Sequence, residues 1–276
     1  MKITTLVENT TKNSMLGSEH GLSLVIEGNH KTFLFDTGAS DLFARNAEKL
    51  GIDLSQVDIA ILSHGHYDHG GGLKTFFKLN DKAPLYVRKE AFGSYYSERD
   101  EGDYHYIGID QDLLRNNRVI FTATRTPAAE GSFLFSKVDG IRFIPTGNKS
   151  LFKQEGTRYV VDAFSHEQYL VLKENEERVL VSGCSHRGIV NIMEAFRNEV
   201  GSYPTRVIGG FHLYNHRTGK PEDPAVLDQI AEILLDSKAI FYTCHCTGEE
   251  NYAYLKEKMG TSIHYLAGGD ILEFSE

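Results

Sequence analysis

The stretch SHGHYDHGGG, residues 63–72, follows an apolar run and decides how this sequence is interpreted. The pattern is typical of a buried β-strand that opens into a glycine-rich loop. On an extended backbone, His64 and His66 point to the same side, so both imidazoles can reach one metal ion. Asp68 and His69 lie beyond the turn, where they can face a second ion. The motif therefore predicts a metal centre at the end of a strand.

Around this motif, short apolar or alternating segments that end at Gly, Asp or Asn predict strands, and longer segments with helical spacing predict helices. The interleaving of the two types predicts an α/β fold. Asp223 before Pro224 predicts a capped helix start, and Thr247 with Glu250 predicts a capping box. Strands are expected within residues 3–8, 22–28, 31–38, 57–65, 83–89, 168–174, 178–183, 205–210 and 239–243, and helices within 41–51, 71–80, 188–200, 224–237 and 248–260.

The composition limits the classes of partner. The chain has 276 residues, 41% of them hydrophobic, and we expect a single domain over residues 1–276. Residues 88–125 are polar, aromatic and irregular, which predicts a cap or lid over the mouth of the site.

The formal net charge of −9 gives no general attraction for nucleic acid or an anionic membrane, so neither is supported as a partner. The start has no signal-peptide pattern and the three cysteines form no disulfide framework, so a cytoplasmic protein is expected. The sequence leaves the oligomeric state open, a homo-oligomer included.

The motif at residues 63–72 resembles the first metal motif of the metallo-β-lactamase superfamily, which is His-x-His-x-Asp-His after a β-strand. The resemblance implies a four-layer αβ/βα sandwich, with two mixed β-sheets packed face to face and flanked by helices. It also implies that Asp36, in FLFDTG, lies behind the histidine loop and hydrogen-bonds a ligand imidazole. The alternative for Asp36 is an ordinary turn residue.

The same resemblance assigns the remaining metal ligands. His166 precedes a strand pair and Cys184 follows that pair, as the superfamily's third histidine and its next ligand do. Members usually have a bridging Asp at the second place, but one lactamase branch has Cys there as a ligand of the second metal. His186 competes with Cys184, and either residue or both could bind. His245 takes the place of the last ligand. One ion is then held by His64, His66 and His166, and the other by Asp68, His69, Cys184 and His245.

Three strings, GCSHRGIVNI, IGGFHL and CHCTG, are similar to a subfamily described as 7,8-dihydropterin-6-yl-methyl-4-(β-D-ribofuranosyl)aminobenzene 5′-phosphate synthase, whose relatives are generally called metal-dependent hydrolases. This similarity implies a phosphorylated or otherwise anionic small-molecule substrate. His212 is expected to contact the substrate, with metal ligation or simple packing as alternatives. Arg187 is a candidate for pairing with a phosphate. Cys244 and Cys246 alternate away from His245 on an extended backbone and are expected to be packed.

A thiolate ligand favours zinc or iron over magnesium, so we expect two divalent transition-metal ions, zinc first, with iron or manganese as alternatives. Such ions lower the pKa of a bridging water, and Asp68 is placed to orient the hydroxide and to pass its proton on. We expect a metal-dependent hydrolase of an anionic small molecule, a phosphate ester or phosphodiester. The alternatives are a carboxylic ester or lactone hydrolase, a synthase-like transferase of a pterin-type substrate that releases diphosphate, and a metal-containing ligand sensor without turnover.

Overall fold

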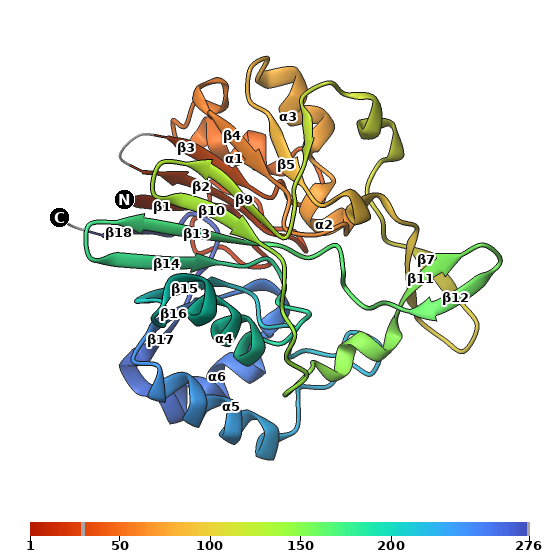
Figure 1. The fold of residues 1–276 in the computed structure, drawn as a ribbon, viewed down its shortest axis with the longest axis vertical. Helices are drawn as coiled ribbons and strands as arrows, with labels where there is room; N and C mark the ends of the chain where they lie inside the picture. The colour runs from red at the N-terminus through yellow and green to blue at the C-terminus, as the bar shows by residue number, and fades with distance from the viewer. Residues whose placement is uncertain (29–30, 275–276) are drawn as a thin grey trace.

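The computed structural model describes residues 1–28 and 31–274, and most of these residues belong to two seven-stranded sheets and the helices that cover them (Figure 1). The first sheet consists, in spatial order, of β18 (Ile271–Glu273), β1 (Lys2–Val7), β2 (Ser23–Glu27), β3 (Thr32–Phe35), β4 (Ile59–Ile61), β5 (Leu85–Val87) and β8 (Val119–Phe121). The second consists of β17 (Ile263–Tyr265), β16 (Ile240–Thr243), β15 (Arg206–Gly209), β14 (Glu177–Val181), β13 (Tyr169–Glu174), β10 (Ser132–Phe135) and β9 (Arg125–Ala129).

Both sheets are mixed, and each is antiparallel on one side and parallel on the other. In the first sheet, β1, β2 and β3 pair antiparallel, while β3, β4, β5 and β8 pair parallel. In the second sheet, β9, β10, β13 and β14 pair antiparallel, while β14, β15, β16 and β17 pair parallel. Each parallel half needs crossover connections, and these supply the helices of the outer layers.

Alternation of buried side chains along the strands produces the layers. On β3, Phe33 and Phe35 pack into the core between the two sheets, while Leu34 packs beneath the helices on the outer face. On β14, Val179 and Val181 face the other sheet, whereas Leu180 faces the helices of its own side.

Helices cover the outer face of each sheet and complete a four-layer αβ/βα sandwich, which confirms the predicted fold (Figure 1). The helices on the side of the first sheet are α1 (Leu42–Lys49), α2 (Tyr67–Gly70) and α3 (Leu73–Leu79), and those on the side of the second are α4 (Ile189–Val200), α5 (Pro224–Asp236) and α6 (Glu249–Met259).

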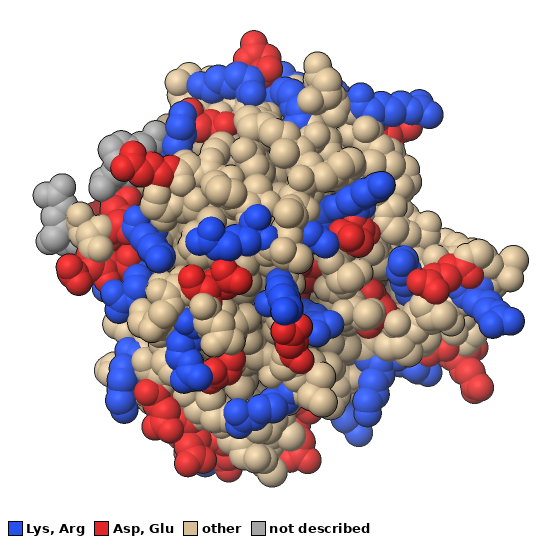
Figure 2. Space-filling view, in the orientation of Figure 1, with Lys and Arg blue, Asp and Glu red and all other residues tan. Residues whose placement is uncertain are grey.

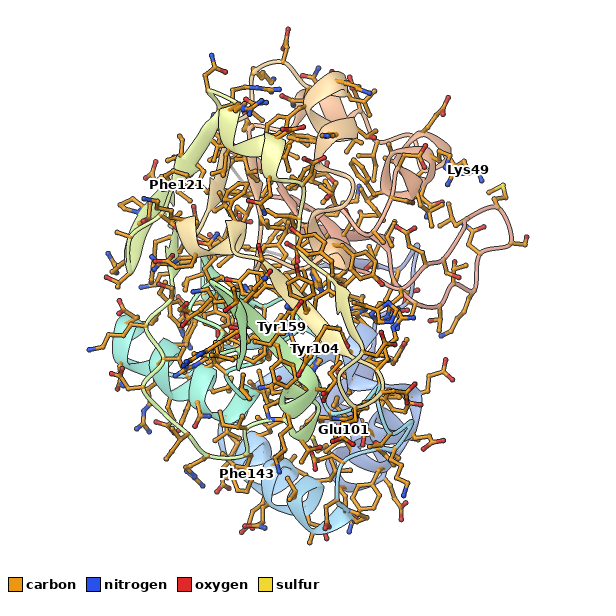
Figure 3. All side chains as sticks on the ribbon, turned by 90° about the vertical axis from the view of Figure 1, so that its right-hand side faces the viewer. Lys49, Glu101, Tyr104, Phe121, Phe143 and Tyr159 are labelled. Atoms are coloured by element: carbon orange, nitrogen blue, oxygen red, sulfur yellow. The ribbon has the colours of Figure 1, made fainter. Side chains whose placement is uncertain are left out.

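A smaller, four-stranded sheet projects from one side of the sandwich (Figure 1). Its spatial order is β12 (Arg158–Val161), β11 (Leu151–Glu155), β6 (Tyr95–Glu98) and β7 (Tyr104–Tyr106). The segment of residues 88–125, which was expected to be irregular, contains the three short strands β6, β7 and β8. Aromatic side chains hold the small sheet together. Tyr104 stacks on Tyr159 with ring centroids 4.0 Å apart, and the two rings lie together in Figure 3.

Of the two predicted helix caps, one is confirmed. The carboxylate of Asp223 accepts a hydrogen bond from the Ala225 N–H, and Pro224 is the first residue of α5. The capping box at α6 is wrong, because Gly248 occupies the N-cap position without a side-chain cap. The Thr247 hydroxyl instead contacts Thr243 Oγ1 at 2.5 Å and accepts from the Phe211 N–H.

Charged residues are mixed on the face shown in Figure 2, where Lys and Arg lie among Asp and Glu rather than forming a stripe of one sign. Among the described residues, no helix combines the length and the apolar character needed to cross a bilayer.

Candidate metal centre

The parallel strands of both sheets end at one edge of the sandwich, and the candidate ligands lie in the loops that follow them. In the first sheet, β3 and β4 lead into Asp36 and the 63–69 loop. In the second, β14, β15 and β16 lead into Cys184, His212 and His245. Since the carboxyl ends of parallel strands meet at the same edge, side chains that are distant in sequence converge there.

Several of these loop residues have an unusual backbone. Asp36, Ser185, His212 and His245 have φ values of 59°, 59°, 50° and 53°, in the left-handed region that non-glycine residues rarely occupy. Such conformations cost free energy and persist where the surroundings impose them, which is common at functional sites. Their concentration at one edge of the sandwich marks that edge as a constrained site.

Asp36 lies behind the histidine loop, as the resemblance implies. Its Oδ1 accepts from the Ser63 N–H at 2.7 Å, and its Oδ2 accepts from the Ser63 hydroxyl at 2.7 Å. Its Oδ2 also lies 2.6 Å from Nδ1 of His69. The carboxylate only accepts, so His69 carries its proton on Nδ1 and, when neutral, has a bare lone pair on Nε2.

His245 is oriented in the same way by Asn9. Its Nδ1 lies 2.7 Å from Asn9 Oδ1, an oxygen that also accepts from the Gly21 N–H. His245 therefore donates from Nδ1, and its Nε2 has a bare lone pair 3.2 Å from Nε2 of His69. Burial lowers the pKa of His245 to about 3, so this imidazole is neutral at neutral pH.

Around these two nitrogens, a carboxylate and a sulfur complete a four-residue group. Asp68 Oδ2 lies 3.2 Å from His245 Nε2, and Cys184 Sγ lies 3.1 Å from His69 Nε2. The ligand atoms of Asp68, His69, Cys184 and His245 all lie within 4.8 Å of one another, and all four residues are buried. Lone pairs at these separations repel unless a proton or a cation lies between them. A carboxylate, a sulfur and two imidazoles are the donor types that bind zinc, so the residues present fit a transition-metal ion.

The first pair of the motif, His64 and His66, forms a second place of convergence. The Ser63 hydroxyl donates to Asp36, so it accepts from Nδ1 of His64 at 2.9 Å and leaves His64 Nε2 bare. That nitrogen lies 3.1 Å from Nδ1 of His66. Burial lowers the pKa of His66 to about 3, and its Nε2 is buried with no partner in the described part of the chain.

His186 faces the same place. Its Nδ1 lies 3.0 Å from Asn148 Oδ1, and the Asn148 amide nitrogen donates to the His186 carbonyl, which fixes the orientation of the amide. His186 Nε2 is therefore bare, and it is buried without a partner among the described residues. The ligand atoms of His64, Cys184 and His186 lie within 4.8 Å of one another. The sequence left open whether Cys184 or His186 faces the ions, and in the structure the ligand atoms of both converge with that of His64.

His166, which the resemblance implies as a ligand, has protein partners at both ring nitrogens in this structure. Its Nδ1 accepts from the Gly65 N–H at 2.9 Å, and its Nε2 lies 2.8 Å from Asp162 Oδ2, so both ring nitrogens have protein partners. The ligand atoms of His166, His66 and Asp162 lie within 4.8 Å of one another. The expected group was His64, His66 and His166. In this position, His166 supports the backbone between the two motif histidines.

A cavity of about 530 Å³ lies over these groups. Its walls include His66, Asp68, Cys184, His186 and His245, together with residues of the small sheet. Sequence analysis missed several residues here because no local motif marks them. Those that line the cavity are His20, Tyr67, Glu98, Arg99, His216 and Arg217, and those that orient candidate ligands from behind are Asn9, Asn148 and Asp162.

His20 contacts the proposed catalytic carboxylate. Its Nε2 lies 3.3 Å from Asp68 Oδ2, the oxygen that also faces His245. Burial raises the pKa of Asp68, but His69, His20 and His245 outweigh that effect and hold it well below its usual range. Asp68 is therefore ionised at neutral pH and available as a ligand or a proton acceptor.

The two residues predicted to contact substrate differ in placement. His212 lines the cavity, and its ring centroid is 4.1 Å from that of His186. Arg187 is not among the residues that line this cavity. Its guanidinium instead donates to the carbonyls of Ala163 and Val138, and its pairing with a phosphate stays a prediction.

The two cysteines beside His245 also differ from each other. Cys244 is packed in the core between the sheets, as expected. Cys246 is buried, yet it lines the cavity and lies within 4.8 Å of the ligand atoms of Cys184 and His212. The expectation that Cys246 only packs is therefore incomplete. The backbone turns at His245, and this turn brings the sulfur of Cys246 to the site.

Comparison with known proteins agrees with this geometry. Residues 16–185 match the family described as the metallo-beta-lactamase superfamily. The 7,8-dihydropterin-6-methyl-4-(beta-D-ribofuranosyl)-aminobenzene-5′-phosphate synthase of Methanocaldococcus jannaschii is 28% identical, over 99% of this chain and 97% of its own. A crystal structure of Tm1679, described as a metal-dependent hydrolase of the beta-lactamase superfamily, is 33% identical over 100% of both chains, with a TM-score of 0.84. The Zn²⁺-bound PqqB of Methylobacterium extorquens shares the fold at 10% identity, with a TM-score of 0.60 over 99% of this chain and 100% of its own.

The sandwich gathers imidazoles, a carboxylate and a thiol at one edge, and the family match covers the histidine motif and extends to Cys184. The chain belongs to the metallo-beta-lactamase superfamily.

Proposed function

We propose that this protein is a metal-dependent hydrolase that acts on an anionic small molecule, a phosphate ester or phosphodiester, with two divalent transition-metal ions, zinc first. One observation carries the proposal. Buried imidazole nitrogens converge with a carboxylate and a sulfur on the wall of a cavity, and the other ring nitrogens of His69 and His245 are committed to partners behind them. Ligand atoms arranged in this way can bind a cation, whereas they do not satisfy one another by hydrogen bonds.

The two groups of donors would hold different ions. The group of Asp68, His69, Cys184 and His245 would hold one. The other would be held by His64 and His66, with His186 as the third imidazole in place of His166. When bound, such ions supply a hydroxide at neutral pH and polarise the oxygen of the bond that is cleaved.

Asp68 would move the proton. Within the described residues, its side-chain contacts to His20, His69 and His245 all use Oδ2. Oδ1 is then the oxygen that would accept a proton from the attacking water and pass it to the leaving group. The contact from His20 would hold the carboxylate in this orientation as the proton moves.

Cationic side chains at the mouth of the cavity support an anionic substrate. Arg99 and Arg217 both line it; Glu98, which is also in the lining, pairs with Arg217 at 2.6 Å, so Arg99 is the cationic side chain that would meet the substrate. The chain as a whole has a net charge of −9, so a local cationic rim is needed to attract an anion. A relative of the whole chain is named as the synthase of a 5′-phosphate, which also supports a phosphate ester as the substrate class.

The test is cleavage of bis-p-nitrophenyl phosphate against a p-nitrophenyl carboxylic ester, with protein loaded in turn with zinc, manganese and iron. His66→Ala is the blank, because it removes a central imidazole from the site. Phosphodiester cleavage that is absent in His66→Ala supports the proposal. Cleavage of the carboxylic ester alone would replace it with an ester or lactone hydrolase. No turnover of either substrate by metal-loaded protein would contradict it.

A second candidate is a transferase that joins an amine to a pterin-type substrate and releases diphosphate. The relative at 28% identity over 99% of this chain, named as a synthase, favours it. Release of diphosphate only when the aromatic amine is supplied would identify this reaction, and the cavity of about 530 Å³ is the place where both substrates would bind.

A further inference from the structure

Three donors at the inner wall of the cavity form a further group, of which the proposed hydrolase uses only Cys184 as a ligand. They come one from each of three neighbouring parallel strands: Cys184 follows β14, His212 follows β15, and Cys246 follows β16. Since these strands are in register and end at the same edge, the three side chains lie in one row across the second sheet.

The three side chains are in mutual reach. Their ligand atoms lie within 4.8 Å of one another, and Cys246 Sγ lies 3.6 Å from the Cys184 carbonyl oxygen. Cys184 and Cys246 are each 2% exposed and His212 is 7% exposed, yet all three line the cavity. An ion that enters the cavity can therefore reach both sulfurs without rearrangement of the core.

The backbone makes room for the second sulfur. A Cβ atom at Gly210 would come within 2.4 Å of Cys246 Sγ, so only glycine at this position allows the thiol to face the row. His212 is held by a left-handed backbone, with φ of 50°. Its Nδ1 is buried and has no hydrogen-bond partner among the described residues. A buried ring nitrogen without a partner needs a ligand to compensate for the water it has lost.

We propose that Cys184, Cys246 and His212 form a further metal site, which binds one soft, thiophilic ion such as Cd²⁺ or Cu⁺ through two sulfurs and one imidazole. Thiolates select such ions over hard cations. The site shares Cys184 with the group of Asp68, His69 and His245, and to that extent it rests on the proposed function. A soft ion bound here withdraws the sulfur from that group, so the site also makes the hydrolytic centre sensitive to thiophilic metals.

The experiment is a titration of the metal-free, reduced full-length protein with Cd²⁺, followed by the ultraviolet thiolate-to-cadmium charge-transfer band. Wild type is expected to show the band of two thiolates. Cys246→Ser is expected to show about half of that amplitude and to bind one Cd²⁺ fewer. Cys244→Ser is the matched control, because Cys244 is an equally buried thiol two residues away that packs between the sheets. It is expected to retain the full band.

Two further measurements do not depend on the folding of the cysteine variant. Cadmium NMR of wild-type protein is expected to show a resonance in the range of two sulfur ligands. His212→Ala is expected to keep the full band while its Cd²⁺ affinity falls by about tenfold or more. A band in Cys246→Ser equal to that of wild type, or a cadmium resonance with one sulfur only, would overturn the site.

These outcomes are separate from those of the hydrolase test. If Cys246→Ser keeps the full band while phosphodiester cleavage is lost in His66→Ala, the soft site fails and the proposed function stands. If the band halves but metal-loaded protein cleaves neither ester, the soft site stands and the hydrolase fails.

Discussion

Replacing Asp36 with Asn tests whether a hydrogen bond from behind the histidine loop sets the metal affinity. The carboxylate accepts three hydrogen bonds, from the Ser63 N–H, the Ser63 hydroxyl and Nδ1 of His69, at 2.6 to 2.7 Å. An amide has only one oxygen, so either orientation of Asn turns an NH₂ group toward a donor. When the NH₂ faces His69, the imidazole must move its proton to Nε2, which is the nitrogen that faces the ion.

The magnitude follows from this change of tautomer. Loss of a contact that orients a metal-binding imidazole lowers metal affinity by about 10- to 100-fold, or about 1.4 to 2.8 kcal/mol. Backbone strain does not contribute, because Asn tolerates the left-handed φ of 59° at position 36. The effect should therefore appear in zinc affinity and in turnover together.

The assay is competition for zinc with a chromophoric chelator, for wild type, Asp36→Asn and Asp58→Asn. Asp58 is a control for the same substitution, because its carboxylate accepts from the Thr32 N–H and Lys31 at a strand end away from the site. Asp58→Asn is expected to bind zinc as wild type does. If Asp36→Asn holds both ions within about twofold of wild-type affinity, the tautomer argument is refuted.

Three further predictions follow from named contacts. His186→Ala should lower the number of zinc ions bound, whereas His166→Ala should keep that number and weaken binding. Metal analysis after dialysis measures both effects. Equal loss of zinc in the two variants would show that His166 is a direct ligand. Arg187→Gln should leave KM for a phosphodiester unchanged, because the Arg187 guanidinium binds two carbonyls outside the cavity. The same variant should reduce the free energy of unfolding, measured by urea denaturation, by about 2 kcal/mol. A raised KM would place Arg187 at the substrate. Glu177→Gln should reduce stability at pH 7 by up to about 1 kcal/mol through loss of the Arg206 pair. Burial raises the pKa of Glu177, but Arg206 and Thr205 outweigh burial, so the pKa is lowered. The ion pair therefore stabilises the fold at a pH above the ordinary glutamate pKa. This stabilisation disappears as the pH falls through the depressed pKa of the folded state. A difference between the two proteins that persists in acid would contradict that assignment.

The sequence by itself determined the class of fold and the first metal motif. The continuous apolar run Phe33-Leu34-Phe35 reflects burial on both faces, and that burial is met by helices outside and a second sheet inside. The spacing of His64, His66, Asp68 and His69 is local, so its geometry can be predicted from the extended backbone and the turn that follows.

Asp36, Cys184 and His245 could be placed because each follows a strand that the residue pattern marks. Strand ends at a common edge are a property of the topology, and the superfamily resemblance supplied that topology. The choice between Cys184 and His186 was left open, since two residues in one loop differ only in how the loop turns.

The tertiary structure alone decided which ring nitrogens of His245 and His186 are left without a protein donor at the site. Asn9 fixes the tautomer of His245 across 236 positions of the chain, and Asn148 fixes that of His186. No local pattern marks either asparagine, because each acts through hydrogen bonds made only when distant loops meet. For the same reason, the sequence could not show that both ring nitrogens of His166 form hydrogen bonds, with Gly65 and Asp162. It also could not show that the sulfur of Cys246 faces the cavity. Burial and direction of side chains in loops depend on the packing of the whole chain, whereas strand and helix periodicity depends on neighbours only a few residues apart.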